Sequence, residues 1–262
     1  MTVVATPYIL PFPVLIEPAP LFSKGTDVAL TVEMVGVVTD KALEMSDSFV
    51  DSFCVLAGTG ALGGDAVPPW ISTIADKGEA RSGPESISWS LKDCRTDDRA
   101  LVILVNLLLS VHETYPLRRV SVGGSTLARP HLPLSQDPGI QNPYPPRWPA
   151  VRFRSAVEAF TTDSRTLSID FEREPSEQER SDIETELLSW SVAPTVGAYA
   201  VAPVSPMSSY LIPTESVEIT GTELLWTLQK VRLHPAALDG LVNVCVAIDH
   251  NLVRIDELRI TG

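Results

Sequence analysis

Apolar and polar residues alternate along two stretches that lie far apart in the chain. In residues 28–34 the apolar side chains include Leu30, Val32 and Met34, and in residues 165–171 positions 167, 169 and 171 are apolar while 168 and 170 are polar. Successive side chains of a strand point to opposite faces of a sheet. Each stretch is therefore expected to form a strand with one buried face and one polar face.

A helix is expected after each of these strands, over about 43–57 and about 176–192. In the second range, Ser176 and Glu179 have the spacing of a capping box, which marks a helix N-terminus. The remaining expected elements are a hairpin at 217–228, helices at 97–113 and 235–249, and closing strands at 118–122 and 254–260. In the first half, a second strand is expected somewhere within 66–82, although this segment could equally be a loop, and the next strand contains Ile87, Trp89 and Leu91.

The two halves of the chain also match each other residue by residue. Residues 30–34 match residues 167–171 in size and polarity at an offset of 137. At the same offset Trp89 recurs as Trp226 and Asn106 as Asn243. A match at a fixed offset over most of a chain indicates a tandem duplication, here of a unit of about 125 to 135 residues.

The order of elements predicts the fold class. Each half reads β-α-β-β-α-β, the order of the ferredoxin-like fold, in which two helices cover one face of an antiparallel sheet. We expect an α+β protein in which two such units form an internal pseudo-dimer. The predicted boundaries are a first repeat at 1–128, a proline-rich connector at 129–149 and a second repeat at 150–262.

The chain is acidic, with 33 Asp and Glu residues, 20 Lys and Arg residues and a formal net charge of −13. Such a charge repels phosphate backbones and attracts basic proteins, so a basic protein is the expected partner and nucleic acid is not. The most apolar run, 100–111, is far shorter than the ~20 residues that span a bilayer, so no membrane span is expected. The odd number of cysteines favours a reducing compartment, and the predicted location is the cytoplasm.

The sequence gives little support for a cofactor, metal or catalytic site. Residues 58–63 spell GxGxxG but follow a predicted helix and not a strand, which favours a helix C-terminus over a nucleotide loop. The histidines and cysteines lack metal-ligand spacing. No nucleophile motif is present. We therefore expect no cofactor and no metal site, and no catalytic residue is assigned.

Two pairs of polar residues occur in both repeats. Asn106 and Asn243 each place an amide in an apolar helix, where it is expected to bind neighbouring backbone or to fix how the halves pack together. Glu33 and Asp170 lie on the polar faces of the two predicted sheets. If those faces pack together, they enclose one polar pocket, with candidate ligand-binding residues Glu33, Ser88, Ser90, Lys92, Asp170, Thr227 and Gln229.

Three functions remain open at this stage. The first is a non-catalytic binding protein that neutralises a basic partner, as an immunity or inhibitor protein does, through the acidic residues Glu172, Glu174, Glu177, Glu179 and Asp182. The second is an enzyme or small-molecule binder that uses the pocket between the repeats. The third is a structural subunit of an assembly, in which exposed sheet edges or the proline-rich arms pair with other chains.

Overall fold

The computed structural model describes residues 12–16, 25–63, 67–96, 98–123, 144–157, 164–199, 212–213, 217–229 and 235–261. Most of the predicted connector lies outside these ranges, and only its last residues, 144–149, are described. The protein is a mixed α+β structure with two sheets and four helices among the described residues.

The elements of the two halves follow each other in the same order. The first half contains β1 (Val14–Ile16), β2 (Thr26–Met34), α1 (Asp40–Thr59), β3 (Asp76–Lys77), β4 (Arg81–Ser82), β5 (Ser86–Cys94), α2 (Asp98–Thr114) and β6 (Leu117–Val122). The second half contains β7 (Arg154–Val157), β8 (Ser164–Phe171), α3 (Glu177–Thr195), β9 (Ile212–Pro213), β10 (Glu218–Thr220), β11 (Glu223–Gln229), α4 (Pro235–Asn251) and β12 (Ile255–Thr261).

The strands of the two sheets are also arranged alike. The first sheet has the order β1-β6-β2-β5-β3, with β4 also on β5, and the second has the order β10-β11-β8-β12-β7, with β9 also on β11. The expectation of purely antiparallel sheets was wrong, because β1 runs parallel to β6 and β7 runs parallel to β12. These edge strands were not predicted because β1 has only three residues and β7 is exposed throughout, so neither shows alternation.

The predicted helices and long strands are confirmed, with ends that differ by a few residues. The uncertain second strand of the first half consists of two short strands, β3 and β4, which both pair with β5. The alternation in β2 places Leu30 and Val32 in the core, with no exposed surface. In α3, the Ser176 side chain accepts from Glu179 N and the Glu179 side chain accepts from Ser176 N, which confirms the capping box.

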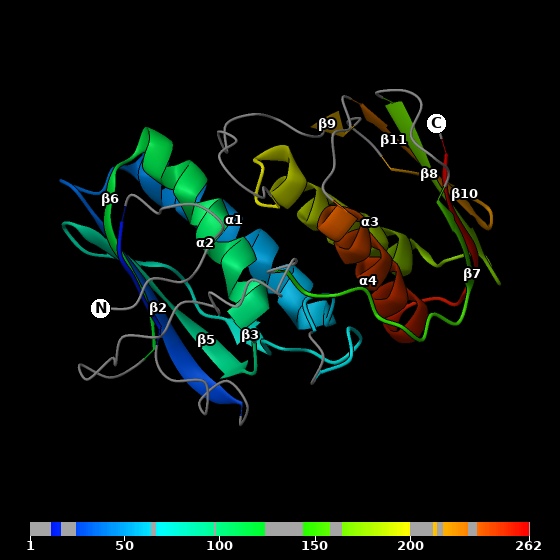
Figure 1. Cartoon of the computed structure of the whole chain (residues 1–262), viewed down its shortest axis with the longest axis horizontal. Coiled ribbons are helices and arrows are strands. Elements are labelled where there is room, and N and C mark those ends of the chain that lie inside the picture. The colour runs from blue at the N-terminus through cyan, green and yellow to red at the C-terminus, as the bar shows by residue number, and fades with distance from the viewer. Residues whose placement is uncertain are drawn as a thin grey trace, which may run out of the picture.

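The helices lie between the two sheets, as Figure 1 shows: one sheet is at each end of the molecule and the four helices fill the middle. Helix α1 packs against α2 of its own half and against α3 and α4 of the other half. The apolar face of each sheet is turned toward these helices, so the polar faces point outward at opposite ends. One hydrophobic core therefore runs through both halves.

The glycine-rich segment after α1 ends the helix, as predicted. Gly60 has φ = 87° and its N–H donates to the carbonyls of Ala57 and Leu56. A Cβ at this position would lie 2.4 Å from the Pro69 carbonyl oxygen, so only glycine fits without a shift of backbone. Over the described parts of the chain, no helix combines the length and apolar character needed to cross a membrane.

Candidate binding site

The structure does not bring the predicted pocket residues together. Glu33 forms an ion pair with Arg119 on the outer face of the first sheet, and Asp170 forms one with Arg259 on the outer face of the second. The helices lie between these two faces (Figure 1). The two carboxylates therefore cannot line one enclosed pocket in this arrangement.

The other predicted pocket residues lie with these acids on the two separate faces. Ser88 and Ser90 lie on β5 and pair with Thr31 and Ala29 of β2. Lys92 donates to Asp27 over 2.7 Å at the end of the same sheet. On the second sheet, Thr227 and Gln229 lie on β11, where Gln229 is exposed.

The predicted acidic surface around the start of α3 is partly neutralised by arginines of the same chain. The carboxylates concerned pair as Glu172 with Arg152, Glu174 with Arg180 and Glu179 with Arg173. The hydrogen bond from Arg173 lowers the pKa of Glu179 to about 2, helped by the bonds with Ser176.

Within the described residues, Glu177 and Asp182 have no ion-pair partner, and Asp182 accepts a hydrogen bond from Gln178 over 2.9 Å. Two of the five predicted partner-binding acids are therefore left unpaired.

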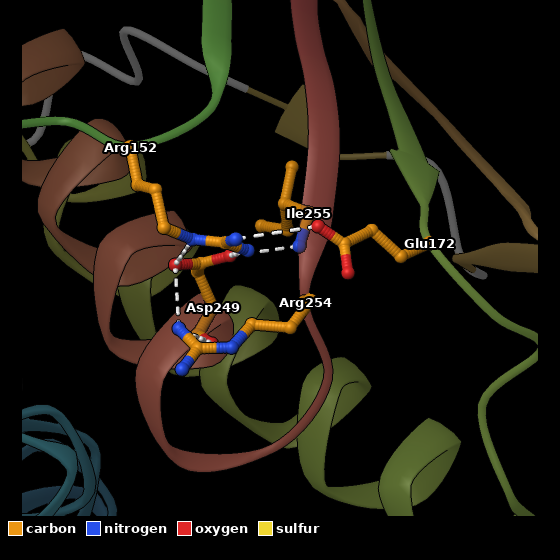
Figure 2. Close-up of polar contacts among 5 residues, drawn as sticks. All are labelled: Arg152, Glu172, Asp249, Arg254 and Ile255. Carbon is orange, nitrogen blue, oxygen red and sulfur yellow. Dashed lines mark hydrogen bonds and ion pairs between the residues drawn. The ribbon is translucent and has the colours of Figure 1, made fainter.

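An ionic cluster centres on Asp249, near the end of α4, whose side chain is only 2% exposed, whereas its charged partners are about half exposed. Figure 2 shows its carboxylate between the guanidinium groups of Arg152 and Arg254, with Glu172 on the far side of Arg152. Asp249 also accepts from the backbone N–H of Ile255 over 2.8 Å. Burial opposes ionisation of Asp249, but the hydrogen bonds from Arg152 and Ile255 outweigh it and lower the pKa. The two acids and two arginines balance in charge, and the cluster joins α4 to β12 and to residue 152.

Asn106 and Asn243 both form hydrogen bonds with backbone groups, which is one of the two roles expected for them. Asn106 on α2 donates to the carbonyl oxygen of Ala198, in the other half of the chain, over 2.6 Å. Asn243 on α4 accepts from Trp148 N over 2.8 Å and donates to the Pro146 carbonyl over 2.9 Å. Asn106 thus helps to fix the packing of the halves, and Asn243 fixes the end of the connector.

A groove that the sequence reasoning missed lies along α1. It has a volume of about 490 Å³ and is lined by Asp40, Leu43, Glu44, Asp47, Lys77, Glu79 and Ala80. Helix α1 supplies one wall, and β3 with the two residues Glu79 and Ala80 supplies the other. Thr39 caps the helix by accepting from Ala42 N over 3.2 Å, which fixes the first turn where Asp40 lies.

Part of the groove lining belongs to an ion-pair network. Lys77 Nζ lies 2.8 Å from Asp47 Oδ1 and 3.1 Å from Asp51 Oδ1, and Trp89 Nε1 donates to Asp47 over 2.7 Å. Burial opposes the charged form of both partners, but these bonds prevail: they lower the pKa of Asp47 and raise the pKa of Lys77. Both groups are therefore held in their charged forms.

The rest of the groove carries unpaired negative charge. Asp40, Glu44 and Glu79 are exposed, and none of them has a cationic partner among the described residues. The spacing of acidic residues at 40, 44, 47 and 51 places them on one face of α1 and could have revealed this wall from the sequence. The sequence could not place Lys77 and Glu79 in the groove, because their position depends on how β3 pairs with β5.

No group of three or more His, Cys, Asp or Glu side chains in the described ranges is placed to hold a metal ion. The three cysteines are free and buried. Burial raises the pKa of the Cys54 thiol to about 12, so this sulfur is held as the unreactive thiol at neutral pH.

No protein-family model matches the chain, and no curated protein matches its sequence. Among solved structures, a mutant of the ferredoxin protease FusC in complex with Arabidopsis ferredoxin is similar over 91% of this chain and 36% of its own, at 12% identity and a TM-score of 0.18. A protease from Helicobacter pylori is similar over 92% of this chain and 77% of its own, at 9% identity and a TM-score of 0.20. The chain thus spans about a third of the length of the FusC chain.

Proposed function

We propose that this is a non-catalytic binding protein whose α1 groove binds a basic segment of a partner protein. The observation that carries the proposal is the group of three exposed carboxylates, Asp40, Glu44 and Glu79, that line the groove with no cationic partner among the described residues. Unpaired charges of one sign on a surface attract and orient a partner of opposite charge.

The groove also suits the shape of lysine and arginine side chains. Leu43 and Ala80 are partly buried and lie among the carboxylates, so they can contact the alkyl part of such a side chain while its charged end reaches an acid. Lys77 gives an internal example, because its side chain is 14% exposed and its ammonium group contacts two acids of α1. A partner's lysine would bind the outer acids in the same way.

The test is the binding of a fluorescent lysine- and arginine-rich peptide to the full chain, measured by anisotropy at low and high salt. Binding should weaken as salt rises, because the contacts are between exposed charges. The triple variant D40N/E44Q/E79Q should bind about tenfold more weakly, which corresponds to roughly 0.5 kcal/mol for each exposed pair.

The control is the double variant E177Q/D182N, which removes two acids of α3 outside the groove, one charge fewer than the triple variant. It should bind within about twofold of the unmodified protein, since it alters net charge but not the groove. A loss shared equally by the two variants would assign the attraction to net charge alone and would reject the groove. Spermine as a competitor would show whether a small polycation occupies the same place.

We also infer that the chain is a tandem duplication of a ferredoxin-like unit, forming an internal pseudo-dimer. The inference is supported by the identical order of elements in the halves and by the equivalent strand order in the sheets. Three buried cysteines without a disulfide support a reducing location, and we propose the cytoplasm.

A further inference from the structure

The turn between β2 and α1 exposes two apolar side chains. Val35 is 61% exposed and Val37 is 77% exposed, the two highest values among the large apolar side chains that the structure describes. Between them Gly36 has φ = 109°, a conformation that valine or another side chain rarely adopts. We call residues 35–37 the valine turn.

The equivalent turn of the second half has the opposite character. Between β8 and α3 the chain reads Glu172-Arg173-Glu174, and each of these side chains has an ion-pair partner. The same position in one molecule is thus charged and internally paired in one half, and apolar and uncovered in the other. Its place in the fold therefore does not demand exposed valines.

The valine turn is held firmly in place. The backbone N–H groups of Val35 and Val38 donate to Pro116 and Pro84 over 2.8 and 2.9 Å. A turn fixed in this way loses little conformational entropy when a partner covers it.

Short chain segments join the valine turn to the two walls of the acidic groove. Val37 lies three residues before Asp40, the first residue of α1 and part of the groove wall. On the other wall, the chain passes from Glu79 and Ala80 through β4 to Pro84, which binds Val38. Two exposed apolar side chains thus lie within a few residues of unpaired negative charge.

We propose that the valine turn and the groove together bind one amphipathic basic segment of a partner protein. Val35 and Val37 pack against its apolar side chains, and Asp40, Glu44 and Glu79 bind its lysines and arginines. This rests on the proposed function and adds the apolar half of the recognised sequence. Charge complementarity selects this occupant: an anionic lipid surface would be repelled by the same acids, and a second copy of this chain carries net negative charge.

The experiment uses two synthetic peptides of equal length and equal positive charge. One has leucines at helical spacing along one face, and in the other each leucine is replaced by serine. Both are measured by fluorescence anisotropy against the full chain and against V35S/V37S. The full chain should bind the leucine peptide about tenfold more tightly than the serine peptide, from burial of the apolar contact.

V35S/V37S should bind the two peptides equally, at the affinity that the serine peptide has for the full chain. The control variant L225S changes another exposed apolar side chain, 39% exposed on β11, and should keep the tenfold preference. Circular dichroism would verify that all variants are folded.

Each other outcome is decisive. Equal, salt-dependent binding of both peptides by the full chain would overturn the apolar contact and leave the proposed function standing. A preference that survives in V35S/V37S would place the apolar contact elsewhere. No binding of either peptide would overturn the proposed function as well, and dimerisation in solution that V35S/V37S abolishes would assign the valine turn to a second copy.

Discussion

His112 and Asp249 occupy equivalent positions in the two halves, and each side chain accepts a hydrogen bond from the first residue of the strand that follows. His112 Nδ1 accepts from Leu117 N over 2.9 Å, and Asp249 Oδ1 accepts from Ile255 N over 2.8 Å. The two positions differ by 137 residues, the offset that relates the halves. One connection between helix and strand is thus made by an imidazole and the other by a carboxylate, so the halves should respond differently to pH.

Replacing Asp249 should be strongly destabilising. Asp249→Ala leaves Arg152 and Arg254 without their shared partner and leaves the Ile255 N–H without its acceptor. We expect a loss of about 2 kcal/mol in the free energy of unfolding at pH 7, measured by urea denaturation, because the buried Ile255 N–H is left without an acceptor. The control Asp256→Asn removes an exposed partner of Arg154 and should cost less than about 1 kcal/mol. Equal effects of the two substitutions would show that the cluster adds nothing beyond a surface ion pair.

His112 should make stability fall as the solution becomes acidic. Burial lowers the pKa of His112, and protonation of Nδ1 would also remove the acceptor for Leu117 N–H. A histidine with a lowered pKa contributes stability that is fully present above its unfolded pKa, about 6.5. This stability is lost as pH falls below that value and through the lower pKa of the folded state. His112→Asn keeps an acceptor that does not titrate. Its stability should fall less than that of the unmodified protein between pH 7.5 and 5.5, and identical slopes in denaturation would contradict the prediction.

Glu186 on α3 should act in the opposite direction. Burial raises its pKa to about 8, helped by Asp182, and its Oε2 atom has no hydrogen-bond partner among the residues that the structure describes. Between about pH 4.5 and 8 the unfolded chain releases this proton while the folded chain keeps it, so stability falls as pH rises, by at most about 1.4 kcal/mol per pH unit. Glu186→Gln should therefore stabilise the protein more at pH 8 than at pH 5. Glu184→Gln, on the same helix, is the control and should give no such difference in melting temperature.

Replacing Asn106 on α2 should reduce the stability of the fold more than replacing an exposed asparagine that also joins the halves. Asn106→Ala removes the donor to the buried Ala198 carbonyl and should lower the free energy of unfolding by about 2 kcal/mol. Asn251 donates to the Thr59 carbonyl across the halves over 3.0 Å, but at an exposed position. Asn251→Ala should cost less than about 1 kcal/mol, and a loss as large as that of Asn106→Ala would refute the role of burial.

Glycine at position 60 should be required by the backbone. Gly60→Ala places a methyl group 2.4 Å from the Pro69 carbonyl oxygen at φ = 87°, whereas Gly221→Ala meets no atom within 4 Å at φ = 58°. Both substitutions carry the cost of a positive φ, and only the first adds a clash with backbone. Gly60→Ala should therefore lower the melting temperature more than Gly221→Ala.

Alternation and helical spacing were enough to predict the long strands and the helices, because Leu30, Val32 and their counterparts report directly which face is buried. The same pattern does not say what covers that face. The pocket around Glu33 and Asp170 required sheets packed face to face, and the helices lie between the sheets instead. The sequence also could not show which acids remain unpaired, because the ion pairs join distant residues. Arg152 and Glu172 are 20 residues apart, and Lys77 and Asp47 are 30 residues apart.

The position of the helices between the sheets has a consequence for how the protein unfolds. Helix α1 contacts α3 and α4, so separating the halves would expose apolar surface of both. The molecule should therefore melt in a single cooperative transition in calorimetry, and the two halves should not melt independently. A backbone cut between residues 123 and 144 should leave two fragments that stay associated, because each fragment buries apolar helix surface of the other.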